Sequence, residues 1–138
     1  MVNFSNIIQL GYALFDPSEH PLRCFHLSAI LYKGRLLSVA VNSPKTHSLN
    51  LKNPKFNISG ENISSSKQSC SELRAILRLK KMTNINSNKC ILVNIRIGRN
   101  GQLANSAPCF SCSSLLRYFS FKNVYFTDNN GRFQIYKA

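Results

Sequence analysis

Two short cysteine motifs that stand far apart in the chain constrain the fold most strongly. The first is Cys70-Ser71-Glu72, and the second is Pro108-Cys109-Phe110-Ser111-Cys112. After each motif, apolar residues recur with the spacing of one face of a helix. We therefore expect a fold that brings two helix starts together, with three thiols and one carboxylate between them.

The three thiols predict a metal site. Cysteine sulfur is a preferred zinc ligand, and a catalytic zinc site typically has three protein ligands and one open position. Cys109 and Cys112 can face one ion from the start of a helix, where thiolate is favoured electrostatically. Cys70 would be the third ligand. Glu72 would remain available to move protons between a water molecule and a leaving group, so the predicted catalytic residue is Glu72 and the predicted cofactor is one Zn²⁺.

Two other interpretations of the cysteines stay open. In a structural zinc site His47 would be the fourth ligand, but Glu72 would then have no role. A redox-active Cys-x-x-Cys pair would not explain Cys70 or the proline before Cys109. The five cysteines are an odd number without regular disulfide spacing, which favours reduced thiols in an intracellular protein. Cys90 opens an apolar strand and is expected to be a core residue.

The net charge of the chain indicates a polyanionic partner. Eighteen Lys and Arg stand against five Asp and Glu, for a formal net charge of +13. Such a charge favours nucleic acid, whereas solubility alone requires much less. The basic residues are spread along the whole chain. The candidate phosphate contacts are Lys45, Lys52, Lys55, Arg74 and Arg117.

The length of 138 residues predicts a single domain. The domain spans residues 1–138, with a helix within residues 1–20 and a long polar loop at residues 42–69 that would form part of the site's wall. No apolar run is long enough to span a membrane, and Met1 to Leu10 lacks the features of a signal peptide. We expect a soluble, cytoplasmic monomer without a membrane partner.

The order of predicted elements indicates an α/β fold with a mixed five-stranded sheet and helices on both of its faces. Ser5 is a candidate N-cap for the first helix, and Ser69 is one for the second. The turn from Asp128 to Gly131 is too short for a parallel crossover, so the last strand should be antiparallel to the one before it. The predicted helices are Asn3 to Phe15, Ser71 to Lys81 and Phe110 to Phe119; the predicted strands are Phe25 to Tyr32, Arg35 to Val41, Cys90 to Ile97, Val124 to Thr127 and Phe133 to Tyr136.

The paired motifs resemble those of the zinc-dependent cytidine deaminase superfamily. Nucleobase deaminases carry His-x-Glu followed by Pro-Cys-x-x-Cys, and cysteine can replace the histidine. The run from Cys70 to Ile76 is similar to that of the three-cysteine deaminases of free cytidine. The segment from Ala40 to His47 resembles a loop of small phage-type and bacterial deaminases. The resemblance covers about Phe25 to Tyr136 and implies a three-layer α-β-α fold.

The resemblance also implies roles for individual residues. Cys70, Cys109 and Cys112 would hold zinc, and Glu72 would be the proton shuttle. The resemblance places substrate contacts at Asn42, at the end of the second strand, and at a backbone carbonyl of Ser106 or Ala107. His47 in the following loop and Phe110 are further candidates for substrate contacts, because His47 could stack on or hydrogen-bond a nucleotide and Phe110 could stack on a base. The alternatives are a solvated loop histidine for His47 and helix or core packing for Phe110.

The expected reaction is hydrolytic deamination of cytosine to uracil in DNA, with single strands preferred because the base must leave the stack. The expected setting is a bacterial or phage-infected cell. One alternative is a salvage enzyme that acts on free cytidine, deoxycytidine or deoxycytidylate, and another is a deaminase of RNA or tRNA. A third is a nucleic-acid-binding module with structural zinc and no enzymatic activity.

Overall fold

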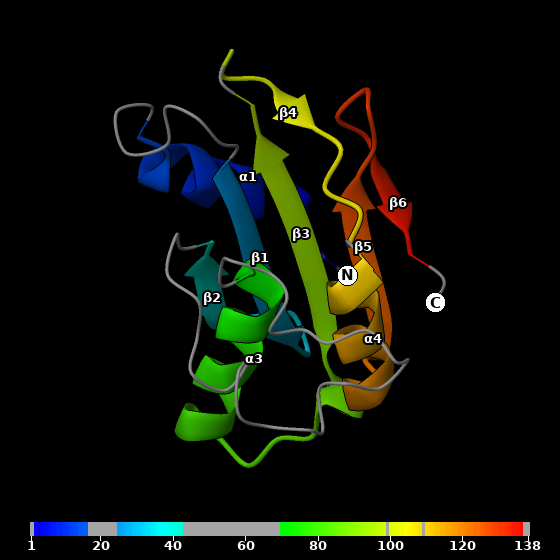
Figure 1. Cartoon of the computed structure of the whole chain (residues 1–138). Coiled ribbons are helices and arrows are strands. Elements are labelled where there is room, and N and C mark those ends of the chain that lie inside the picture. Colours follow the sequence, from blue (N-terminus) through cyan, green and yellow to red (C-terminus); the bar gives the residue numbers. More distant parts are fainter. Residues whose placement is uncertain (1, 17–24, 43–69, 99, 109, 137–138) are drawn as a thin grey trace.

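The computed structural model describes residues 2–16, 25–42, 70–98, 100–108 and 110–136 (Figure 1). Within these ranges no helix combines the length and apolar character that crossing a membrane would require. The elements are the helices α1 (Phe4–Leu14), α3 (Ser71–Met82) and α4 (Phe110–Phe119), the 3-10 turn η3 (Ser87–Lys89), and the strands β1 (Phe25–Tyr32), β2 (Arg35–Val41), β3 (Ile91–Ile97), β4 (Leu103–Ala104), β5 (Asn123–Thr127) and β6 (Phe133–Ile135).

The strands form one mixed sheet in the order β2-β1-β3-β5-β6, with β4 paired to β3. Only β3 and β5 are parallel, and the other pairs are antiparallel. This confirms the predicted α/β class and the antiparallel last strand. The prediction of five strands was wrong by one, because β4 folds back on β3 through a turn at Gly101, which has a φ of 79°. A two-residue strand is too short to show an alternating pattern in sequence.

The first two strands form the hairpin that the sequence predicts, and their bounds match the prediction. Both residues of the connecting turn, Lys33 and Gly34, have positive φ, at 50° and 78°. Two left-handed residues give a hairpin turn whose twist matches that of the strands. In the order of strands, β2 lies at one edge of the sheet, and β1 lies between β2 and β3.

The sheet has an apolar core on each face. On one face α1 packs against β1 and β3, through Ile7, Leu27 and Ile95 among others. On the other face α3 and α4 pack against Ile30 and Leu92. Figure 1 shows α1 behind the sheet and the two motif helices in front of it. Alternation along β1 and β3 thus decides which of their side chains face the motif helices.

Two details of the helices differ from the sequence prediction. α1 begins at Phe4, and its N-cap is Asn3, whose Oδ1 accepts a hydrogen bond of 3.2 Å from the backbone N–H of Asn6. Ser5, the predicted cap, lies inside the helix. α3 runs one residue beyond the predicted Lys81, to Met82, whose side chain is 67% exposed.

α1 lies unusually close to β3 at Gly11. A Cβ built on this glycine would be 2.3 Å from Cδ1 of Ile95, which is fully buried. A side chain at this position would need Ile95 to move within a packed core. The glycine therefore sets the distance between α1 and the sheet.

The turn between β5 and β6 is held by Asp128. Its Oδ1 accepts from the backbone N–H groups of Asn130 and Arg132 at 2.9 and 3.0 Å, and its Oδ2 accepts from Nε2 of Gln134 at 3.0 Å. These donors, led by the N–H of Arg132, lower the pKa of the Asp128 carboxyl. The ionised carboxylate fixes the tight return that makes β6 antiparallel to β5.

Candidate active site

The first motif lies at the start of α3. Cys70 occupies the N-cap position and is partly buried, and Glu72 is the second residue of the helix with only 6% of its surface exposed. Ser69, the predicted cap, lies outside the described residues. Ser, Thr, Asp and Asn are the usual N-cap residues, so helix initiation does not explain a cysteine here.

Hydrogen bonds hold both oxygens of the Glu72 carboxyl group. Ser71 Oγ donates to Oε1 at 3.1 Å, and Nδ2 of Asn94 donates to Oε2 at 3.3 Å. Ser28 joins the two donors, because its Oγ lies 2.8 Å from Ser71 Oγ and donates to Oδ1 of Asn94 at 2.6 Å. The four side chains form a closed ring of contacts that links α3 to β1 and β3.

All four members of this ring are buried, with exposed fractions between 0 and 6%. Ser28 and Asn94 are also directly opposite each other in the pairing of β1 with β3. A carboxyl group taken out of water requires such partners. The ring therefore fixes the position of Glu72 before any substrate binds.

Sequence reasoning missed Ser28 and Asn94 as parts of the site and treated Ser71 only as a spacer. The signal that could have found them is polarity at positions where strands are otherwise apolar. Ser28 interrupts Phe25–Tyr32, and Asn94 interrupts Ile91–Ile97. A buried polar residue needs a partner, and the two residues are in register.

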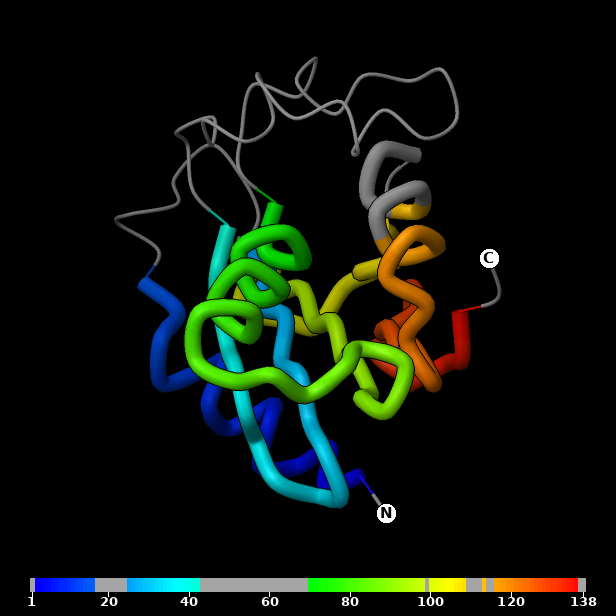
Figure 2. The backbone as a smooth tube through the Cα atoms, turned by 90° about the horizontal axis from the view of Figure 1, so that it is seen from below, coloured from blue at the N-terminus to red at the C-terminus, as the bar shows by residue number. Residues whose placement is uncertain are grey.

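The second motif lies at the start of α4, whose bounds match the predicted helix. α3 and α4 contact each other, and Figures 1 and 2 show them side by side on the same face of the sheet. Cys112 is in the first turn of α4, although its side chain and that of Phe110 are outside the described part, as is the whole of Cys109. Among the side chains that are described, no three potential metal ligands come together.

The segment that enters α4 is anchored by Ser106, which is 1% exposed. Its Oγ donates to the backbone carbonyl of Asn94 at 2.9 Å and lies 2.8 Å from Oγ1 of Thr127. Its N–H donates to the carbonyl of Thr127 at 2.8 Å. The exposed Ala107 donates its N–H to Oδ1 of Asn105 at 2.8 Å. The predicted contact of a Ser106 or Ala107 carbonyl with substrate stays a prediction.

Asn42 extends the pairing of β1 and β2 beyond the last residue of β2. Its N–H donates to the carbonyl of His26, and its Oδ1 accepts from the N–H of His26, both at 3.1 Å. Asn42 is half-buried at this end of the strand. Its predicted contact with a base or sugar stays a prediction, and His47 lies outside the described residues.

The predicted phosphate contacts are distributed differently in the structure. Arg74 is half-buried, and its Nη1 donates to the carbonyl of Val41 at 2.6 Å; Arg78 binds the carbonyl of Val39 in the same way at 2.9 Å. These arginines cover the outer edge of β2, a structural role that the prediction for Arg74 did not include. Arg117 is exposed in the last turn of α4. Lys45, Lys52 and Lys55 lie outside the described residues.

Comparisons with protein-family models, with curated proteins and with solved structures gave no match to this chain. The function of the chain is therefore inferred from the residues of the two motifs and from the ring of contacts around Glu72.

Proposed function

We propose that this protein is a zinc-dependent deaminase that converts cytosine to uracil in DNA, with single strands preferred, on a cytidine deaminase-like three-layer fold. The observation that carries the proposal is the buried Glu72. It follows Cys70 at the start of α3, is held on both oxygens, and lies on a helix that packs beside the one carrying Cys112. A role in proton transfer would explain why a carboxyl group is buried at a helix start beside a thiol.

The donor set fits a zinc ion. Cys70 stands at the N-cap of α3 and Cys112 in the first turn of α4, and helix N-termini favour thiolate over thiol. With Cys109, these residues would supply three thiolate ligands and leave one position for the reaction. Glu72 is engaged by Ser71 and Asn94 and is not needed as a ligand. When bound, zinc would supply Lewis acidity and lower the pKa of water toward neutrality.

The chain's own contribution is the movement of protons. Water adds across the C4–N3 bond of cytosine, with its oxygen on C4 and a proton on N3. The bond from C4 to the exocyclic amine then breaks, and ammonia leaves as a carbonyl forms at C4. Glu72 accepts a proton from the attacking water and donates one to the leaving amine. Because Ser71 and Asn94 restrain both of its oxygens, the carboxyl group does not need to reorganise during the transfer.

The positive net charge of the chain favours a polynucleotide substrate over a free nucleoside. The net charge of +13 attracts phosphate chains, whereas a free nucleoside would gain little from it. A base in a duplex must leave the stack to reach a buried carboxyl, and a single strand avoids most of that cost. Single-stranded DNA is therefore the proposed substrate.

A substrate panel tests this choice. The purified protein is incubated with single-stranded DNA, duplex DNA, RNA, cytidine and deoxycytidylate, and uracil product is measured. We expect turnover of single-stranded DNA, with log K for binding falling by about 0.7 per unit of log salt for each phosphate contacted. Product from cytidine or deoxycytidylate alone would identify a salvage enzyme, and product from RNA alone would identify an RNA-acting one. Either result contradicts the proposed substrate.

Asn94 is predicted to position Glu72. Asn94→Leu removes the donor to Oε2 of Glu72 and the acceptor of the hydrogen bond from Ser28 Oγ. We expect the free energy of unfolding to fall by about 1–3 kcal/mol. We also expect kcat for uracil formation to fall by at least about tenfold with KM little changed, because the carboxyl loses its fixed orientation.

Ser38→Ala is the matched control for Asn94→Leu. Ser38 is buried, and its Oγ donates to the carbonyl of Ala75 on α3 at 2.8 Å, away from Glu72. This variant should lose about 1 kcal/mol of stability and keep kcat. An equal loss of kcat in both variants would assign Asn94 a purely structural role.

A further inference from the structure

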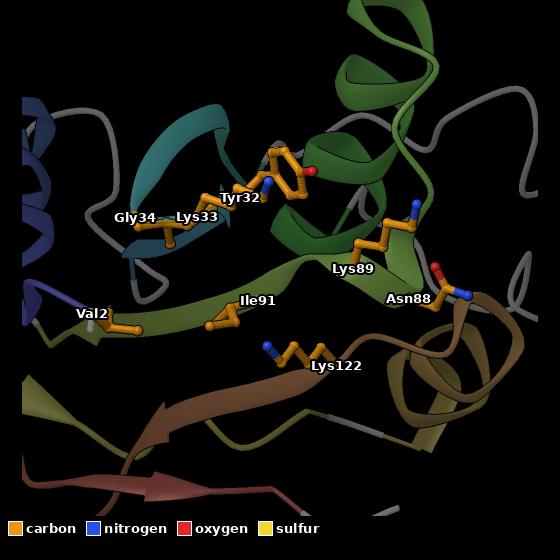
Figure 3. A pocket seen from close by; sticks show the side chains of 9 residues that line it. Val2, Tyr32, Lys33, Gly34, Asn88, Lys89, Ile91 and Lys122 are labelled. Carbon is orange, nitrogen blue, oxygen red and sulfur yellow. The ribbon is translucent and has the colours of Figure 1, made fainter.

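A pocket of about 540 Å³ lies where β1 ends and β3 begins (Figure 3). Its walls come from the turn between β1 and β2, from η3, and from the residue before β5. Neither Glu72 nor any other member of the ring of contacts lines it. The pocket is therefore distinct from the candidate active site, and its function does not depend on the proposed deamination.

Three lysine side chains line this pocket. Figure 3 shows Lys33, Lys89 and Lys122 arriving from three different segments of the chain. The backbone N–H of Lys122 donates to the carbonyl of Cys90 at 2.9 Å, which places the segment of Lys122 beside that of Lys89. The three lysines thus line one pocket because of the sheet's topology and not because they are neighbours in sequence.

Among the residues that the structure describes, no carboxylate balances these charges within the pocket. The three acidic residues in the described ranges are Asp16, Glu72 and Asp128, and none of them lines it. Like charges that share a pocket repel one another, and an anionic ligand would remove that repulsion. The three positive charges therefore favour a ligand with several negative charges.

The position of Lys33 adds an independent observation. Lys33 has a φ of 50° in a turn where Asn, Asp and Gly are preferred. Its Nζ lies 5.3 Å from the centroid of the Tyr32 ring, which also lines the pocket. The conformation of the turn does not require a lysine at this position. The Tyr32 ring attracts the ammonium group of Lys33 and keeps it beside the pocket.

The rest of the lining is apolar, with an amide. Leu31, Ile91 and Val2 provide apolar surface, and Asn88 provides hydrogen-bonding groups. A volume of about 540 Å³ falls within the range of small-molecule sites, which is about 300–1,000 Å³. A lone phosphate ion would leave most of this space unfilled, whereas a nucleotide has both a polyanionic and a planar apolar part.

We propose that this pocket binds a nucleoside triphosphate, with its phosphates at Lys33, Lys89 and Lys122 and its base against the apolar wall. The test is calorimetric titration of the folded protein with ATP, adenosine and inorganic tripolyphosphate at about 0.15 M salt, where long-range attraction is screened. We expect saturable binding of ATP, weaker binding of tripolyphosphate, and none of adenosine.

Charge-matched double variants make the test specific. Lys89→Gln with Lys122→Gln should raise the Kd for ATP at least about tenfold, equivalent to about 1.4 kcal/mol. Lys80→Gln with Lys81→Gln removes the same charge from α3, outside this pocket, and should leave the Kd unchanged. Circular dichroism should show that both double variants fold, because all four lysine side chains are exposed.

Three outcomes would overturn the proposal. The first is an equal loss of ATP binding in both double variants, which would reveal attraction by net charge alone. The second is no saturable binding of ATP. The third is binding of a single-stranded oligonucleotide that depends on Lys89 and Lys122 while ATP does not bind, which would assign the pocket to a polynucleotide.

Discussion

Glu72→Gln should lower kcat for the conversion of cytosine to uracil by about 10²–10⁴-fold, the usual contribution of general acid–base catalysis. Glutamine has nearly the same shape and can still accept a hydrogen bond from Nδ2 of Asn94. It cannot take a proton from water and return it to the leaving amine. The loss should therefore appear in kcat, with substrate affinity and zinc content unchanged.

Glu72→Gln is informative because the residue is buried in a ring of contacts. Glu72→Ala would remove the hydrogen-bond partner of Ser71 and Asn94. A loss of activity could then come from lost stability as well as from lost catalysis. The amide keeps an acceptor in place, so the thermal midpoint should change little. Cytosine conversion at the wild-type rate by a folded, zinc-containing Glu72→Gln variant would contradict the proposed proton shuttle.

Cys70→Ala should weaken zinc binding strongly and abolish activity. Two remaining thiolates hold zinc much more weakly than three, so metal analysis of the purified variant should show less than stoichiometric zinc. If zinc is bound at about 1,000 times its Kd, loss of the metal also removes about 4 kcal/mol of stability. The measurements are zinc per chain, uracil formation, and unfolding with and without added zinc.

Cys90→Ala is the matched control for Cys70→Ala. Cys90 is fully buried in the core beneath α3 and α4. Burial raises the pKa of its thiol, an effect that the charge of nearby Lys80 partly offsets. A protonated core thiol is not a zinc ligand, so this variant should lose about 1 kcal/mol of stability and keep its zinc and its activity. Stoichiometric zinc in Cys70→Ala would contradict the ligand assignment.

The regular elements were predictable because their signals are local. The hairpin turn Lys33-Gly34, the apolar periodicity after each cysteine motif, and the short turn at Asp128 each act within a few residues. These signals predicted the bounds of β1, β2 and α4 and the direction of β6. The burial of Cys90 was also predictable, because this residue stands directly before the apolar run of β3.

The surroundings of Glu72 were not predictable, because they depend on the alignment of distant strands. Ser28 meets Asn94 only because β1 pairs with β3 in that register, and a shift of one residue would place the two side chains on opposite faces of the sheet. The pocket at Lys33, Lys89 and Lys122 depends on the same sheet order. The polarity of Ser28 and Asn94 can be read from the sequence, but their partners depend on how the strands pair in the folded sheet.

The proposed reaction is tested most directly by mass spectrometry of a single-stranded DNA that contains one cytosine, after incubation with the zinc-loaded protein in water labelled with ¹⁸O. We predict that the amine of that cytosine is replaced by oxygen from the labelled solvent, with ammonia released in equal amount, and that Glu72→Gln forms this product at least about 100-fold more slowly. An unchanged oligonucleotide with folded, zinc-loaded wild-type protein would contradict the proposed deamination of DNA.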